Sequence, residues 1–163
     1  MLETSLLIVN TDAAMSEALR GHLSRDQTFR VIGTADTGTK ALSIIQSEQP
    51  DMVLMDLLLP EMDGLCLLKR MQSMKKPPIA ICLSEFYSAL CVDAARRSGA
   101  SYYIFKPATL ESIASILREY AELSRESVQR AQFKQEALEE DEYILSIHRE
   151  LNDLGFSPKY IGS

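Results

Sequence analysis

Short apolar runs alternate with amphipathic stretches along most of the chain. Five runs are almost continuously apolar, at residues 6–9, 29–33, 52–55, 79–83 and 102–105. Such runs are typical of strands that are covered on both faces. Between them apolar residues recur at helical spacing, and glycine or proline falls where a helix must end. The pattern predicts an α/β fold, a doubly wound five-stranded parallel sheet with helices on both faces.

Polar residues end four of the predicted strands: Asn10, Asp56, Ser84 and Lys106. The carboxyl ends of parallel strands meet at one edge of the sheet, where ligands bind in open α/β folds. The sequence therefore predicts that these four side chains gather in a ligand-binding site at this edge.

The run MVLMDLLLPEMDGL, with Ser84 closing IAICLS and Lys106 closing YYIFK, resembles the phosphoacceptor site of two-component response regulator receiver domains. The resemblance implies a receiver domain over residues 1–123 with the flavodoxin-like strand order 2-1-3-4-5. It also implies that Asp56 is the phosphoacceptor and that Ser84 and Lys106 contact the phosphoryl group. Tyr103, three residues before the lysine, takes the place of the aromatic switch residue.

The metal site is where the sequence departs from that family. Receivers hold Mg²⁺ with two adjacent acids after the first strand, and in LLIVNTD these places are taken by Asn10 and Thr11. The remaining candidate ligands are Asp56, the backbone carbonyl of Leu58, and Asp12, which lies one position too late and has the form of a helix N-cap. Because Mg²⁺ prefers carboxylate oxygen, we expect it to bind weakly or not at all.

Two functions stay open at this point. The chain is a response regulator whose Asp56 takes a phosphoryl group from a histidine kinase or phosphotransfer protein, or it is a pseudo-receiver that pairs with other proteins, such as another response regulator, without Mg²⁺-dependent transfer. Asn10 and Thr11 favour the second, as does Glu85, which follows Ser84 and repels an anionic donor. In neither case do we expect an enzyme.

The segment after residue 123 is predicted to be helical. Residues 124–140 continue the last receiver helix as a linker, which is either a solvated helix or part of a dimer contact. Residues 141–163 form the start of an effector-like helical segment, with an apolar stripe that predicts a homodimer: Ile144, Ile147, Leu151 and Leu154. The spacing in ILSIHRELNDLGFSPKYIGS is similar to the start of the effector domain in stage-zero sporulation response regulators of endospore-forming bacteria, which implies a related sporulation transcription regulator.

Charge and composition limit the kinds of partner that the chain can bind. The 163 residues carry a net charge of −6, and residues 124–163 hold five basic and eight acidic residues, a net of −3. We therefore expect no DNA binding by this chain alone. Three cysteines without paired spacing, no positively charged leader and no membrane-length apolar stretch predict a cytoplasmic protein that does not enter membranes.

Overall fold

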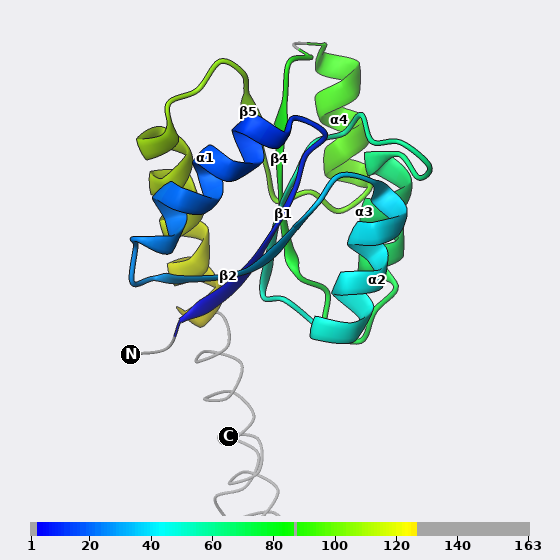
Figure 1. Ribbon diagram of the computed structural model, residues 1–163. Coiled ribbons are helices and arrows are strands. Elements are labelled where there is room, and N and C mark those ends of the chain that lie inside the picture. Colours follow the sequence, from blue (N-terminus) through cyan, green and yellow to red (C-terminus); the bar gives the residue numbers. More distant parts are fainter. Residues whose placement is uncertain (1–2, 87, 127–163) are drawn as a thin grey trace, which may run out of the picture. The chain divides into compact units, whose positions relative to one another are not determined.

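The structure is a computed structural model that describes residues 3–86 and 88–126. Strands and helices alternate along the chain (Figure 1), and a further helix covers residues 110–126. The other elements are β1 (Thr4–Val9), α1 (Ala13–Ser24), β2 (Phe29–Ala35), α2 (Gly38–Glu48), β3 (Met52–Met55), α3 (Gly64–Gln72), β4 (Ile79–Ser84), α4 (Ala89–Arg97) and β5 (Tyr102–Phe105). All strand pairs are parallel, in the order β2-β1-β3-β4-β5. The predicted sheet, including its strand order, is confirmed.

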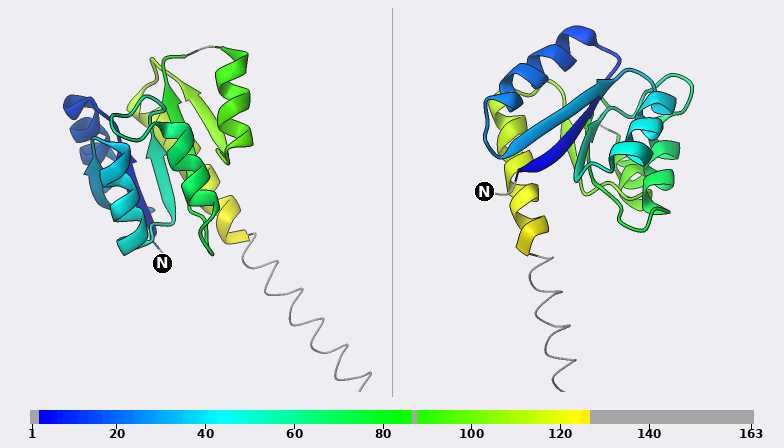
Figure 2. Two further views of the ribbon diagram at one scale, coloured as in Figure 1. Left: turned by 90° about the vertical axis from the view of Figure 1, so that its right-hand side faces the viewer. Right: turned by 60° about the horizontal axis from the view of Figure 1, so that its bottom comes forward.

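The helices form two layers with the sheet between them. One layer holds α1 and residues 110–121 of the last helix, and the other holds α2, α3 and α4, as Figure 1 and the two views of Figure 2 show. Alternate residues of β1 serve the two layers, because successive side chains of a strand point to opposite faces. Leu6 and Ile8 pack under the first layer, and Leu7 and Val9 under the second. This double coverage explains the near-continuous apolar runs.

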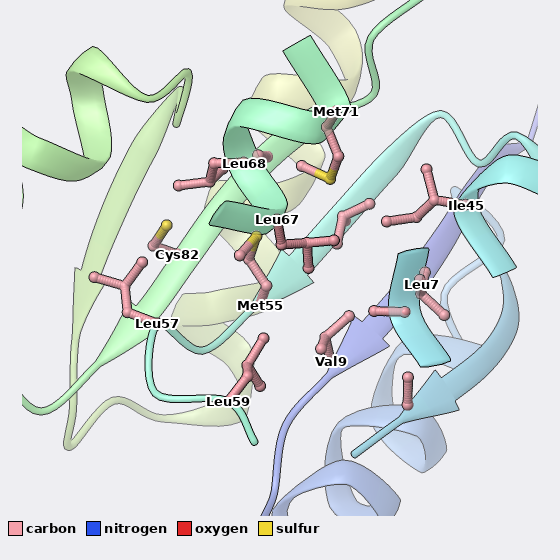
Figure 3. Packing of buried hydrophobic residues seen from close by; sticks show 14 of the residues in the cluster. Leu7, Val9, Ile45, Met55, Leu57, Leu59, Leu67, Leu68, Met71 and Cys82 are labelled. Atoms are coloured by element: carbon pink, nitrogen blue, oxygen red, sulfur yellow. The ribbon is translucent and has the colours of Figure 1, made fainter. Parts of the chain in front are cut away.

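The core beneath α2 and α3 supports the end of β3. Leu67 and Leu68 of α3 and Ile45 of α2 are fully buried in one cluster with Met55, the last residue of β3 (Figure 3). Large aliphatic side chains that lose all contact with water contribute about 1.5–3 kcal/mol each. Asp56, which follows Met55, is therefore held at the end of a closely packed strand.

A charged network joins the two helices of the first layer. Arg118 donates to Asp26 at 2.7 Å and to Glu111 at 2.5 Å, and Glu111 pairs with His22 of α1 at 3.0 Å. Burial by itself would raise the pKa of Asp26, but hydrogen bonds from the backbone of Thr28 and from Arg118 outweigh it and lower that pKa overall. The network therefore stabilises the contact between α1 and the helix over residues 110–126 while Asp26 is ionised.

The chain divides into two units, Met1–Ala121 and Glu122–Ser163. The predicted receiver boundary at residue 123 stays a prediction. Of the linker predicted at 124–140, the structure describes only residues 124–126. The rest of the linker and the effector-like segment predicted at 141–163 lie outside the described residues. The same holds for the predicted interaction residues Ile144, Ile147, Leu151 and Leu154. Within the part that the structure describes, no helix is both long and apolar enough to cross a membrane.

Candidate functional site

The candidate site is centred on an ion pair between the ends of β3 and β5. The Nζ atom of Lys106 lies 3.0 Å from Oδ2 of Asp56, and the two side chains are 16% and 14% exposed. The backbone N–H of Asp56 donates to Val9 (2.9 Å), and that of Lys106 donates to Ser84 (2.8 Å). These bonds extend the strand ladders by one residue at the carboxyl edge. The sheet therefore brings together two residues that lie 50 positions apart.

Both carboxylate oxygens of Asp56 have a donor. While Oδ2 faces Lys106, Oδ1 accepts the backbone N–H of Leu58 at 3.3 Å. The loop after Asp56 is held by the start of α3, where the N–H of Gly64 donates to the Leu57 carbonyl at 2.8 Å. A Cβ atom on Gly64 would lie 2.6 Å from the Cα of Leu57, so only glycine allows this approach. The loop thereby fixes the direction of the Asp56 carboxylate.

Ser84 and Tyr103 meet at the loop between β4 and α4. Ser84 is fully buried, and its Oγ accepts the N–H of Phe86 at 3.3 Å. The Tyr103 hydroxyl donates to the carbonyl of the same residue, Phe86, at 3.2 Å. Burial raises the pKa of Tyr103, against a smaller lowering by a hydrogen bond with the Ser84 side chain. The phenol therefore stays a protonated donor at neutral pH, and both side chains hold the β4–α4 loop.

Cys82 lies in β4 beneath the site and takes no part in its polar contacts. Burial, together with the charge of Asp56, raises the pKa of the Cys82 thiol to about 12. The side chain belongs to the apolar cluster that also holds Met55 and Leu57 (Figure 3). The floor of the site is therefore apolar and uncharged at neutral pH.

The end of β1 presents polar atoms that are already engaged by the backbone. The amide oxygen of Asn10, a buried residue, accepts the N–H of Asp12 at 2.9 Å. Oδ1 of Asp12 accepts the N–H groups of Ala14 and Met15 at 3.0 and 3.2 Å, so Asp12 is the N-cap of α1. Thr11 is exposed between them.

The donor set at this edge fits Mg²⁺ poorly. Asp56 is the carboxylate at the end of β3, and the neighbouring end of β1 offers Asn10 and Thr11 in place of acids. Asp12 uses its carboxylate to cap a helix. Among residues 3–86 and 88–126, no group of three His, Cys, Asp or Glu side chains is placed to hold a metal ion. Among the described residues that directly follow β1 and β3, Asp56 is the one carboxylate that does not cap a helix, and its Oδ2 is already paired with Lys106, so little anionic oxygen is left for a hard divalent cation.

Sequence reasoning named the four polar groups but missed three backbone contacts. It did not indicate that the Leu58 N–H binds Asp56, that Asn10 turns back onto Asp12, or that Ser84 and Tyr103 both bind Phe86. The MDG sequence that ends in Gly64 was a usable signal for the first, because a glycine after an Asp N-cap allows close approach of the preceding loop. Exposed Glu85 lies beside Ser84, as the sequence order requires.

Residues 6–118 match the model of the response regulator receiver domain family, and the chain belongs to this family. Over 135 residues it is 26% identical to the "Probable C4-dicarboxylate response regulator DctR" of Halalkalibacterium halodurans, covering 83% of this chain and 59% of that protein. The chain thus spans 59% of the length of this curated relative.

Two solved structures share the fold. The response regulator domain of CheB from Thermotoga maritima is 28% identical, with a TM-score of 0.66 over 75% of this chain and 96% of that chain. A signal receiver domain from Mycobacterium tuberculosis is 24% identical, with a TM-score of 0.71 over 75% of this chain and 98% of that chain.

These comparisons confirm the receiver domain and its place in two-component systems. They do not support the similarity to sporulation regulators, since the curated relative is named as a C4-dicarboxylate regulator. That part of the resemblance stays a prediction.

Proposed function

We propose that the chain is a two-component signalling switch in which Asp56 accepts a phosphoryl group from a phosphohistidine of a kinase or phosphotransfer protein. The ion pair between Lys106 and Asp56 carries this proposal, because it places a cation 3.0 Å from the attacking carboxylate. A carboxylate oxygen forms a bond to phosphorus, and the phosphorus–nitrogen bond of the donor breaks. The released imidazole takes a proton from water. The product is an acyl phosphate on Asp56.

Each neighbouring group has a role in this proposal. Lys106 neutralises the phosphoryl oxygens, and the N–H of Leu58, which already points at Oδ1, donates to them. The Ser84 hydroxyl turns from the N–H of Phe86 to the phosphoryl group. That change removes one contact that holds the described part of the β4–α4 loop, while the bond from Tyr103 to the Phe86 carbonyl remains. Tyr103 thereby links the chemical state of the site to this loop.

We further propose that Mg²⁺ contributes little, because Asn10 and Thr11 replace the usual acids. Incubation with radiolabelled acetyl phosphate should therefore label the protein slowly, and a calorimetric titration should give a Mg²⁺ affinity weaker than millimolar. The double substitution Asn10→Asp with Thr11→Asp should increase both labelling and affinity, since it supplies two carboxylates beside Asp56. Sub-millimolar Mg²⁺ affinity in the unsubstituted chain would overturn this part of the proposal.

The second candidate is a pseudo-receiver, a protein–protein interaction module that works without phosphorylation. It is favoured by Asn10, whose amide oxygen is engaged by the Asp12 N–H, and by exposed Glu85, which repels an anionic donor. Replacing Glu85 with alanine separates the two candidates. Faster labelling of Glu85→Ala supports a hindered switch, whereas no labelling even when this change is combined with Asn10→Asp and Thr11→Asp supports the pseudo-receiver.

The remaining functional assignments are proposals of the same kind. We propose a cytoplasmic homodimer that acts with a histidine kinase, a phosphotransfer protein or another response regulator, and that does not bind DNA by this chain alone. Neither candidate function makes it an enzyme. Sedimentation tests the dimer directly, because a monomer at tens of micromolar would refute it. Phosphotransfer from a sporulation phosphorelay protein, compared with transfer from an unrelated kinase, tests the relation to sporulation regulators.

A further inference from the structure

A cluster of cations lies at the C-terminal ends of α3 and α4, away from the candidate site. The sequence has no acidic residue between Asp63 and Glu85, although the chain holds 23 acids. The four cations in this stretch are all exposed: Lys69 and Arg70 in the last turn of α3, and Lys75 and Lys76 in the loop after it. Within residues 3–86 and 88–126, none of these four forms an ion pair.

Two further cations join this cluster from α4. Arg96 and Arg97 lie in the last turn of α4, and both pair with Asp93. The turn after α4 contacts the last turn of α3, since Gln72 donates to the Gly99 carbonyl at 3.4 Å. Gly99 has φ +115°, and a Cβ atom there would collide with the Gln72 side chain, so the contact is close.

We call the six residues the basic edge: Lys69, Arg70, Lys75, Lys76, Arg96 and Arg97. It lies where α3 and α4, neighbours in one helical layer (Figure 1), lead into β4 and β5. The phosphoacceptor site lies at the opposite edge of the sheet, beyond the carboxyl ends of the strands.

The charge of the basic edge is opposite to that of the chain. Six cations and the one carboxylate of Asp93 leave a net of +5, whereas the whole chain carries −6. Cations in the last turn of a helix are stabilised by the helix dipole, which accounts for the four in α3 and α4. It does not account for Lys75 and Lys76, which follow the end of α3. Lys69, Arg70 and the two lysines after α3 have no ion-pair partner within residues 3–86 and 88–126, so they repel one another, and an anionic partner relieves that repulsion.

We propose that the basic edge docks an acidic segment of a partner protein, one that carries several clustered Asp or Glu side chains. At physiological salt, charges are screened within about 8 Å, so a short acidic segment senses the basic edge and little of the negative remainder. A long nucleic acid extends over many screening lengths, so it also meets the negatively charged remainder of the chain. Residues 64–84 and 88–101 also contain no aromatic side chain on which a base could stack. The guanidinium group of an arginine can donate two parallel hydrogen bonds to one carboxylate, which favours Asp or Glu side chains as the bound groups.

Fluorescence anisotropy with the full chain and a labelled ten-residue poly-glutamate peptide tests this proposal. We expect binding at 20 mM salt that weakens about fivefold or more at 150 mM, as screening requires. The triple variant Lys69→Glu, Lys75→Glu, Lys76→Glu should lose about tenfold in affinity, a change of about 1.4 kcal/mol. The matched control reverses three exposed arginines, Arg20 in α1, Arg25 directly after it and Arg30 in β2, and changes the net charge equally. Circular dichroism checks that both variants remain folded.

The outcomes separate cleanly. Loss in the first variant with little change in the control supports docking at the basic edge. Equal loss in both variants would show that only net charge matters, and no binding at low salt would also overturn the proposal. Tighter binding of a ten-nucleotide oligothymidine than of the peptide would assign the surface to nucleic acid instead. Labelling of Asp56 should be unchanged in the first variant, so this test is independent of the proposed phosphoryl transfer.

Discussion

Replacing Lys106 with methionine tests how much the central ion pair contributes to stability. Methionine keeps the unbranched side chain but removes the ammonium group, so the carboxylate of Asp56 keeps the bond from the Leu58 N–H and loses the one from Lys106. Breaking a buried pair costs about 3–5 kcal/mol, and breaking an exposed one about 0.2–1 kcal/mol. With side chains 16% and 14% exposed, this pair is closer to the buried case. We expect Lys106→Met to lower the free energy of unfolding by about 2–3 kcal/mol.

A double-mutant cycle isolates the pair from other effects of the substitution. Asp56→Asn should cost about 1 kcal/mol, because the amide oxygen still accepts from Lys106. The double variant should then be more stable than the sum of the single effects implies, by about 1.5 kcal/mol or more. Urea unfolding at pH 7, followed by circular dichroism, measures all four proteins. The matched control is the pair of Lys40 and Asp36, which lie 3.1 Å apart with side chains 67% and 63% exposed.

For the control pair we expect a coupling free energy below about 0.5 kcal/mol. Equal coupling in the two pairs would refute the reasoning, because it would mean that burial at the carboxyl edge does not strengthen the interaction between Asp56 and Lys106.

Three further predictions follow from the remaining contacts. Asp12→Ala should destabilise the chain by about 1 kcal/mol in urea unfolding, through loss of the α1 cap, and leave labelling of Asp56 unchanged; reduced labelling would show that Asp12 serves the site. Asp26→Asn should destabilise at pH 7, because the lowered pKa of Asp26 contributes stability above its ordinary value of 3.8 and loses it as pH falls through the lower folded pKa, so the difference from the unsubstituted chain should shrink progressively below pH 3.8. Alkylation at pH 8, read by mass spectrometry, should modify exposed Cys66 and spare Cys82, whose pKa is raised to about 12.

The sheet was predictable because buried parallel strands are marked by their own side chains. The runs at 52–55 and 102–105 coincide with β3 and β5. The run at 6–9 misses the first two residues of β1, Thr4 and Ser5, which are polar but buried. Ser5 is satisfied there by Asp51, whose Oδ2 accepts from its hydroxyl at 2.9 Å. The spacing of apolar residues does not indicate that Ser5 has a hydrogen-bond partner 46 positions away.

The site was predictable only in part. Strand order places Asp56 and Lys106 at the same edge of the sheet, because the carboxyl ends of parallel strands share an edge, although β4 lies between β3 and β5. The contacts that decide what these residues can do depend on loop geometry. Whether Asn10 faces a metal or the backbone of Asp12, and whether Ser84 and Tyr103 share Phe86, follows from the course of the chain after each strand, for which residue type is a weak guide.

The central claim is that Asp56 accepts a phosphoryl group with the help of Lys106. Its most direct measurement is to incubate the chain with acetyl phosphate, reduce the product with borohydride, which converts an aspartyl phosphate to homoserine, and map the modified residue by mass spectrometry. The account predicts slow conversion at Asp56, with or without added Mg²⁺, and none in Lys106→Met. Absence of conversion at Asp56 after prolonged incubation, or conversion that is undiminished in Lys106→Met, would contradict it.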